Sequence, residues 1–150
     1  MWTSEQRVRL LLEENILKQE LPCFVWEDRI QRGETKVVGD YVSSGGNAYK
    51  ICLKFPSNYP YEMPKLYILS PHILSGYGGK TIQSYGTSHA MHVWESDWNN
   101  YVKICHCKSE YWSASKTIVT VLMNGMLWLE GFEAHRRTGK VIDSFSLTYS

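Results

Sequence analysis

The sequence VKICHCKSEYWSASKTI, residues 102–118, contains the features that decide the predicted fold. Cys105 ends a short segment in which two apolar residues flank a lysine, and a polar run then leads to Trp112 and Ser113. A long apolar segment begins directly afterwards. This order predicts a thiol on an extended segment that a tight connection joins to a helix N-terminus. Because the partial positive charge at a helix N-terminus favours a thiolate or a developing oxyanion, we take Cys105 as the candidate nucleophile.

The segment after this connection predicts one long helix from residue 115 to about residue 137. Apolar residues recur there at helical spacing and form a wide stripe: Ile118, Val121, Leu122, Leu129 and Phe132. Gly125 and Gly131 weaken the pattern, and Thr138-Gly139 is a suitable helix stop.

Upstream of the cysteine, the sequence predicts four strands, at residues 23–30, 36–42, 48–55 and 65–70. Glycine and polar residues separate the first three strands at hairpin-like spacing, which favours an antiparallel meander. Residues 55–68 hold three of the five prolines, so they predict a stiff loop between the third and fourth strands. Residues 72–104 lack clear periodicity, and a loop of this length inside a domain is usually functional.

The N-terminal residues predict an amphipathic helix that ends before Leu21. Thr3 and Gln6 have the spacing of a capping box. Apolar residues then recur at helical spacing and are expected to pack on the sheet: Val8, Leu11, Leu12 and Ile16.

The bulk composition fits one globular domain over residues 1–150, with 43% hydrophobic and 21% charged residues. A net charge of +1 gives no reason to expect a nucleic-acid or anionic-membrane partner. No apolar run reaches the roughly 18 residues of a membrane span, and the N-terminus lacks a secretion signal. Four cysteines in a chain of this kind are expected to be free thiols in a reducing cytosol, so we expect a cytoplasmic protein.

The whole pattern resembles the family of ubiquitin-conjugating enzymes. Their active-site signature has an Ile/Val-Cys-Leu segment followed, after a short gap, by Trp-Ser-Pro-x-x-Thr-Ile and a helix. The same order is found here in Ile104-Cys105, Trp112-Ser113 and Thr117-Ile118, with Ala114 in place of the proline. Residues 55–64 are also similar to the family's Phe-Pro-x-x-Tyr-Pro-x-x-x-Pro loop. The resemblance implies an α+β fold with an N-terminal helix, a four-stranded meander, a flap over the cysteine and one long packed helix.

The end of the predicted long helix narrows the resemblance to bacterial members of the family. Residues 128–141 resemble the Trp-Leu-x-x-Tyr-Glu-x-Trp-x-x-Thr-Gly-x-Trp ending of stand-alone members in antiphage (CBASS) operons, with Phe132, His135 and Val141 at the three departures. Those operons also encode cGAS-like nucleotidyltransferases. Few residues follow Gly139, so the two C-terminal helices of eukaryotic enzymes are not both expected.

The resemblance implies an enzyme that forms a thioester between Cys105 and the C-terminus of a ubiquitin-like protein or a cGAS-like nucleotidyltransferase. An amine would then attack the thioester, and no cofactor is expected. A separate activating enzyme would supply the activated carbonyl. In the family the first helix contacts that enzyme, which implies the same role here for Arg7, Arg9 and Lys18.

One departure from the family concerns the oxyanion. Conjugating enzymes carry a His-Pro-Asn shortly before the cysteine, and this chain has none. His92-Val93-Trp94 resembles the His-x-Tyr of bacterial members, so we expect His92 to organise the flap or to shuttle a proton. The alternative is a surface or loop histidine. Asn99 or Asn100 is a weaker candidate for the missing amide donor.

Two alternatives to this prediction remain open. His89, His92, Cys105 and Cys107 could bind zinc, but Cys-x-Cys is shorter than the usual ligand spacing and we expect no metal. Cys107 could otherwise be a resolving thiol or a core residue. The second alternative is a non-catalytic module of the same fold that recognises a ubiquitin-like tail. The absence of His-Pro-Asn favours this module, whereas the presence of the cysteine favours the enzyme.

Overall fold

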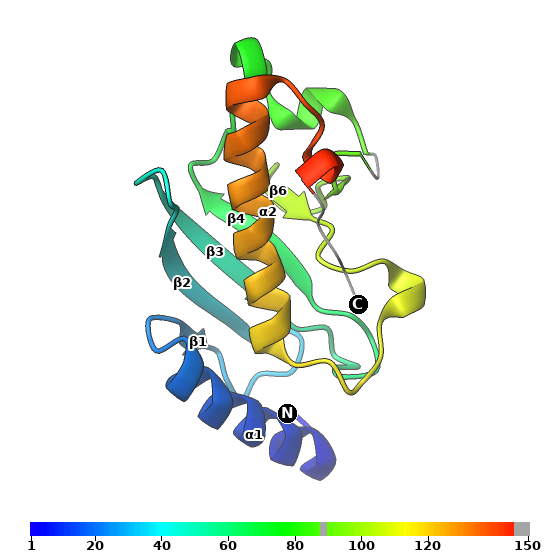
Figure 1. Ribbon diagram of the computed structural model, residues 1–150. Coiled ribbons are helices and arrows are strands. Elements are labelled where there is room, and N and C mark those ends of the chain that lie inside the picture. Colours follow the sequence, from blue (N-terminus) through cyan, green and yellow to red (C-terminus); the bar gives the residue numbers. More distant parts are fainter. Residues whose placement is uncertain (88–89, 146–150) are drawn as a thin grey trace.

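The structure is a computed structural model that describes residues 1–87 and 90–145 (Figure 1). Helix α1 (Ser4–Glu20) is followed by four strands: β1 (Val25–Glu27), β2 (Lys36–Val42), β3 (Ala48–Lys54) and β4 (Lys65–Ser70). Next come two 3₁₀ turns and two short strands: η1 (Tyr77–Gly79), η2 (Ile82–Tyr85), β5 (Val93–Trp94) and β6 (Val102–Ile104). The described chain then continues through η3 (Ser109–Tyr111), α2 (Ile118–Thr138) and η4 (Ile142–Phe145). The predicted α+β class is confirmed.

The strands form one antiparallel sheet in the order β1-β2-β3-β4-β6-β5. The predicted four-stranded meander is confirmed, and the predicted bounds of β2 and β4 are correct. The prediction of residues 72–104 as a loop was wrong in part, because β5 and β6 lie at the end of this segment and extend the sheet. The periodicity was undetectable because these strands have only two and three residues.

Helix α2 crosses one face of the sheet (Figure 1). Leu66 of β4 approaches it so closely that a side chain at Gly125 would place its Cβ 2.6 Å from a Leu66 methyl group. Gly125 therefore serves close packing, although it weakens the helix. Trp128, Leu129 and Phe132 are fully buried on the same helix, as the predicted apolar stripe requires.

The C-terminal half of α2 holds the β2–β3 hairpin through Glu133, which is 3% exposed. Its Oε2 atom accepts hydrogen bonds from the hydroxyls of Ser43 and Tyr49, both at 2.6 Å, and from the amide of Asn47 at 2.9 Å. Burial alone would raise the pKa of Glu133, but these hydrogen bonds lower it below its ordinary value. The carboxylate therefore stays ionised inside the structure.

Helix α1 has the predicted capping box, in which Thr3 and Gln6 bond each other's backbone amides. Its predicted buried face was wrong, however. Val8, Leu11, Leu12 and Ile16 are exposed. The buried side chains lie on the opposite side of the helix and include two polar ones: Gln6, Leu10, Glu13 and Leu17.

Polar contacts explain which side of α1 is buried. The Gln6 amide donates to the carbonyls of Ser57 and Tyr59, both at 2.9 Å. Glu13 contacts the Tyr59 hydroxyl and the start of α2. Accordingly, α1 packs beside β1 and the N-terminus of α2 and does not lie across the sheet (Figure 1).

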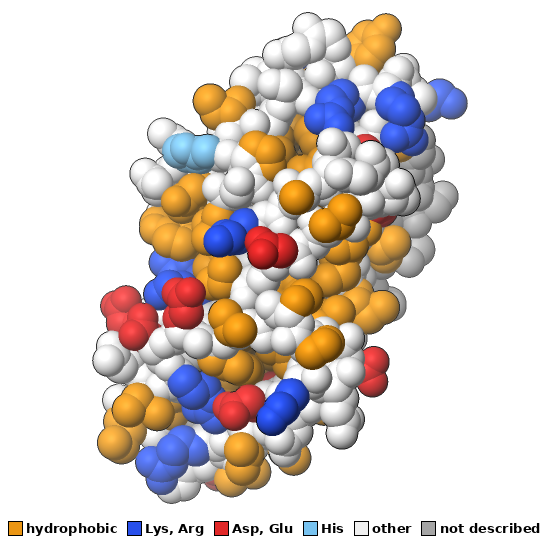
Figure 2. Space-filling model, turned by 90° about the vertical axis from the view of Figure 1, so that its left-hand side faces the viewer, with side chains coloured by type: hydrophobic (Ala, Val, Ile, Leu, Met, Phe, Trp, Pro, Cys, Tyr) orange, Lys and Arg blue, Asp and Glu red, His pale blue; other side chains and the backbone are white. Residues whose placement is uncertain are grey.

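The face of the molecule shown in Figure 2 carries many hydrophobic side chains between separate charged ones. Among the described residues, no helix is both long and apolar enough to cross a membrane.

Candidate functional site

The β5–β6 hairpin places His92 and Cys105 opposite each other. Val93 pairs with Ile104 in the sheet, and one residue further along the backbone amide of Cys105 donates to the carbonyl of His92 at 2.9 Å. His92 has a φ of 51°, so the chain turns there as it enters β5. Two of the three predicted site residues are therefore brought together by the backbone.

The Cys105 thiol is buried, with only 7% of the residue exposed. Its Sγ atom donates to the carbonyl of Cys107 at 3.7 Å. The pKa of Cys105 is raised to about 11, mainly by burial; the backbone contact with Cys107 lowers it and the neighbouring Cys107 thiol raises it. The sequence predicted surroundings that favour the thiolate, whereas burial in the structure favours the protonated thiol.

The N-terminus of α2 is already occupied by a carboxylate from α1. The helix begins at Ile118 rather than at Ser115, and the amide of Ile118 donates to the Glu13 carboxylate at 2.9 Å. A negative charge from α1 therefore already occupies the positive end of this helix.

His92 is 1% exposed, so it is not a surface histidine, but it lies in the turn directly before β5, as the loop alternative has it. Its Nε2 atom lies 2.7 Å from Oδ1 of Asp143 in η4, and the amide of Asp143 donates to the carbonyl of Ala90 at 2.7 Å. These two contacts attach η4 to the segment before β5. Both roles expected of His92, in organising the flap and in shuttling a proton, stay predictions.

Asn100 lies at the opposite end of β6 from Cys105. Asn99 and Asn100 have φ values of 48° and 58°, so they form the turn between β5 and β6. Left-handed backbone of this kind is tolerated by asparagine better than by most residues. Cys105 lies five positions after Asn100, which separates the two by roughly 16 Å along an extended segment. The structure therefore does not bring the amide of Asn100 to the thiol.

The residues after Cys105 are buried as well. His106 is 1% exposed, its Nε2 atom donates to the carbonyl of Pro64 at 2.7 Å, and burial lowers its pKa to about 4. Cys107 is 2% exposed and its Sγ donates to the carbonyl of Lys108 at 3.2 Å. Within residues 1–87 and 90–145, no three His, Cys, Asp or Glu side chains gather as metal ligands. His89, part of the alternative zinc site, lies outside the described residues.

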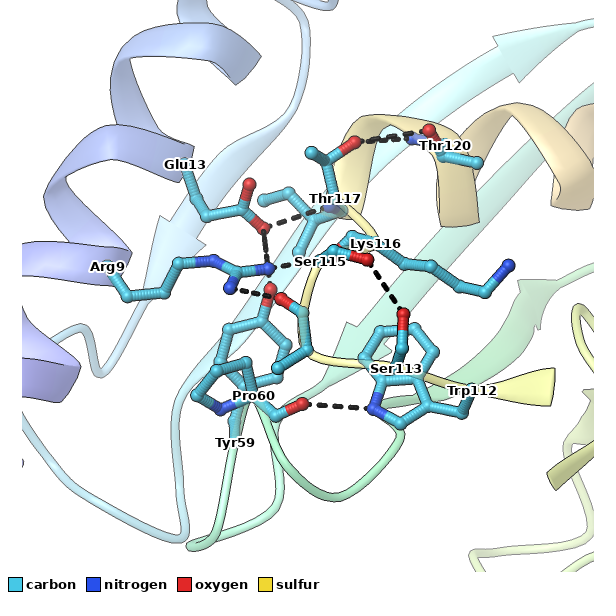
Figure 3. Close-up of polar contacts among 12 residues, drawn as sticks. Arg9, Glu13, Tyr59, Pro60, Trp112, Ser113, Ser115, Lys116, Thr117 and Thr120 are labelled. Atoms are coloured by element: carbon cyan, nitrogen blue, oxygen red, sulfur yellow. Dashed lines mark hydrogen bonds and ion pairs between the residues drawn. The ribbon is translucent and has the colours of Figure 1, made fainter. Parts of the chain in front are cut away.

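The loop between Trp112 and α2 is held by a polar network from α1 and the proline-rich loop (Figure 3). The Trp112 indole donates to the carbonyl of Pro60 at 2.9 Å. The Arg9 guanidinium donates to the carbonyl of Ala114, and to that of Lys116 at 2.7 Å. Arg9, which the resemblance assigns to the activating enzyme, is thus engaged within the molecule.

Glu13 is the buried centre of this network, with a side chain 2% exposed. The Tyr59 hydroxyl donates to its Oε2 atom at 2.5 Å, and the amide of Ile118 donates to the same atom (Figure 3). One carboxylate therefore joins α1, the proline-rich loop and the first turn of α2.

Three residues near the site were not predicted from the sequence: Asn124, Glu13 and Asp143. Asn124 of α2 donates to the carbonyl of His106 at 3.2 Å and so supports the turn after Cys105. Its signal was available, because it is the single side-chain amide in the apolar stretch 118–129. Glu13 and Asp143 gave no such signal, since their partners lie far away in the sequence.

No protein-family model matches the chain, and neither does any curated protein or solved structure.

Proposed function

We propose that the chain is a ubiquitin-conjugating-like cysteine acyltransferase that acts through Cys105. The observation that carries the proposal is the pairing of Cys105 with His92 across the β5–β6 hairpin. This pairing places the candidate nucleophile at the end of a strand, beside a histidine from the flap. The resemblance of residues 55–64 and 104–118 to conjugating enzymes supports the same assignment.

The proposed reaction has two acyl-transfer steps. In the first step the Cys105 sulfur bonds to the carbonyl carbon of a thioester on an activating enzyme, the old carbon–sulfur bond breaks, and the Cys105 proton passes to the departing thiolate. In the second step the nitrogen of an amine bonds to that carbon, the bond to Cys105 breaks, and one amine proton restores the thiol. Sulfur suits both steps because it is a good nucleophile and a good leaving group.

The burial of Cys105 adds a requirement to this proposal. A thiol with a pKa of about 11 is almost entirely protonated at neutral pH, and 7% exposure leaves no room for an incoming carbonyl. The reaction therefore needs a conformation in which the residues over Sγ have moved. The contacts of Asp143 with His92 and Ala90 attach η4 to the segment before β5. These contacts are candidates for the interactions that break when Sγ becomes accessible.

The partners follow from the resemblance to bacterial members. We propose that the acyl group comes from the C-terminus of a ubiquitin-like protein or of a cGAS-like nucleotidyltransferase, in the cytoplasm of a bacterium, as part of antiphage (CBASS) defence. A separate activating enzyme forms the first thioester. Its contact surface on α1 includes Arg7 and Lys18, which are both exposed.

The test is formation of a covalent adduct in a mixture of the chain, an activating enzyme, ATP and the partner. We expect a non-reducing gel to show an adduct that thiol or hydroxylamine cleaves. Cys105→Ala should abolish it, whereas Cys107→Ala and the exposed-site control Cys23→Ala should retain it. If Cys107→Ala alone lost the adduct, the nucleophile would be Cys107 and not Cys105.

The second candidate function is a non-catalytic module of the same fold that binds a ubiquitin-like tail. The burial and raised pKa of Cys105 favour this function. It predicts that no adduct forms, and that the partner's tail binds wild type and Cys105→Ala with equal affinity in calorimetry.

A further inference from the structure

The carboxylate of Asp143 in η4 is held against the imidazole of His92. Its Oδ1 atom lies 2.7 Å from Nε2 of His92. The backbone amide of Asp143 donates to the carbonyl of Ala90 at 2.7 Å, and the neighbouring Ile142 is fully buried. The position of the carboxylate is therefore fixed by the backbone of η4 and by the core.

This contact decides where the ring of His92 carries its proton. A carboxylate can only accept hydrogen bonds, so Nε2 is the donor and is protonated. The side chain of His92 has no exposed surface, so water does not replace Asp143 at this atom. Nδ1 is therefore the ring nitrogen at which His92 takes up and releases a proton.

Nδ1 is also the ring nitrogen that is closer to the backbone of His92. This backbone is paired with Cys105, because the carbonyl of His92 accepts from the amide of Cys105 at 2.9 Å. Nε2, by contrast, is directed to η4. The nitrogen that exchanges a proton is thus the one nearer to the hairpin that carries the thiol.

We propose that Asp143 is a positioning residue that keeps a proton on Nε2 of His92, so that His92 exchanges protons with the acyl-transfer site through Nδ1. This role rests on the proposed function of Cys105. In the first step, Nδ1 takes the Cys105 proton as the sulfur bonds to the carbonyl carbon, and gives it to the departing thiolate as the old carbon–sulfur bond breaks. In the second step, Nδ1 takes one proton from the attacking amine and gives it to the Cys105 sulfur as that bond breaks.

The proposal distinguishes the two contacts of Asp143. The carboxylate contact with His92 must be present during proton transfer, so only the amide bond to Ala90 is free to break when the thiol becomes accessible. If η4 were only a cover, loss of the carboxylate would loosen it and speed the reaction of Cys105. A cover and a positioning residue therefore predict opposite effects of Asp143→Asn.

The first measurement locates the ring proton and needs no partner. The imidazole ¹⁵N resonances of His92 are followed by NMR in the full chain while the pH is raised. We expect Nε2 to keep its proton at alkaline pH, and Nδ1 to be the nitrogen that titrates. In Asp143→Asn the side-chain amide can donate to Nε2, so we expect part of the neutral ring to change to the Nδ1–H form. A proton on Nδ1 of the neutral wild-type ring would overturn the proposal.

The second measurement uses S-phenyl thioacetate as a small acyl donor and follows acetylation of Cys105 by mass spectrometry. We expect Asp143→Asn and His92→Gln each to slow acetylation about 100-fold, the lower end of what a positioned acid or base contributes. The double variant should be no slower than His92→Gln alone, because Asp143 acts through His92. The control is Asp40→Asn, the same change at an exposed aspartate, which should leave the rate unchanged.

Faster acetylation in Asp143→Asn, or an additional loss of rate in the double variant, would overturn the proposal. If His92→Gln does not fold, the direction of the change in Asp143→Asn decides between a positioning residue and a cover. If the wild-type chain takes no acetyl group on Cys105, the proposed function fails, whereas the NMR result still decides where Asp143 holds the proton.

Discussion

The amide of Cys105 and the carbonyl of His92 are joined by a hydrogen bond of 2.9 Å across the β5–β6 hairpin. The backbone therefore fixes the position of the cysteine independently of either side chain. The His92 imidazole is directed to Asp143 instead. We therefore expect the reactivity of Cys105 to be limited by the burial and the protonation of its sulfur, and not by the position of its strand.

The reactivity of the thiol should follow from its raised pKa. Because the pKa of Cys105 is about 11, its thiolate fraction should increase about tenfold per pH unit between pH 7 and 10. We expect its alkylation by iodoacetamide, measured peptide by peptide in a mass spectrometer, to accelerate over this range without a plateau. Exposed Cys23 is the internal reference and should react first at pH 7. A plateau for Cys105 below pH 8 would contradict the structure.

Removal of the Glu13 carboxylate should destabilise the whole chain. Glu13→Ala leaves the Tyr59 hydroxyl and the Ile118 amide without their acceptor in a buried place. We expect the free energy of unfolding to fall by about 2–4 kcal/mol in urea titrations. The matched control is Glu20→Ala on the exposed end of the same helix, which should change it by less than about 0.5 kcal/mol. Similar values for the two variants would rule out the network as a source of stability.

The two apolar sides of α1 should respond differently to truncation. Leu17→Ala removes a side chain 1% exposed and should cost about 2–5 kcal/mol. Leu12→Ala removes one 56% exposed and should change stability by about 0.5 kcal/mol or less. Thermal and urea unfolding of both variants measure this difference in stability. A larger loss of stability for Leu12→Ala would indicate that the buried face of α1 is the one predicted from the sequence.

Glu133 should make stability depend on acid pH. Its folded pKa lies below the ordinary value of 4.5, so below that value the unfolded chain takes up a proton before the folded one does. Its contribution is therefore complete above about pH 5 and is lost as the pH falls through the folded pKa. Glu133→Gln should lower stability at pH 7 by about 1–3 kcal/mol and show a smaller further loss between pH 5 and 3. Equal pH slopes for the two proteins would argue against this role.

Local rules predicted the elements whose signals are local. The capping box of Thr3 and Gln6 and the strands β2 and β4 needed only neighbouring residues, and all were confirmed. The start of α2 was predicted too early because Arg9 binds the carbonyls of Ala114 and Lys116, which holds this segment outside the helix. A partner about a hundred positions away leaves no local trace.

In the candidate site, too, the sequence did not reveal what depends on contacts between distant residues. The resemblance pointed to His92 as well as Cys105, and the backbone of the two residues is indeed paired, but the sequence could not reveal that the thiol is covered. Asn100 was proposed for its amide, whereas its φ of 58° places it in the left-handed region, which asparagine tolerates better than most residues do. The buried face of α1 was predicted wrongly because apolar residues recur at helical spacing on two sides of this helix. Only the polar contacts of Gln6 and Glu13 decide which side is buried.

The bond from Ile118 to Glu13 has a consequence for the newborn chain on the ribosome. Helix α1 is synthesised before α2, and the amide that completes its buried carboxylate belongs to a residue 105 positions further along the chain. Until Ile118 has been added, the Glu13 carboxylate must stay hydrated, so α1 cannot pack in its final position. Helix α1 is therefore completed only after α2 has begun to form, and a nascent chain stalled before residue 118 should leave α1 open to proteases and chaperones.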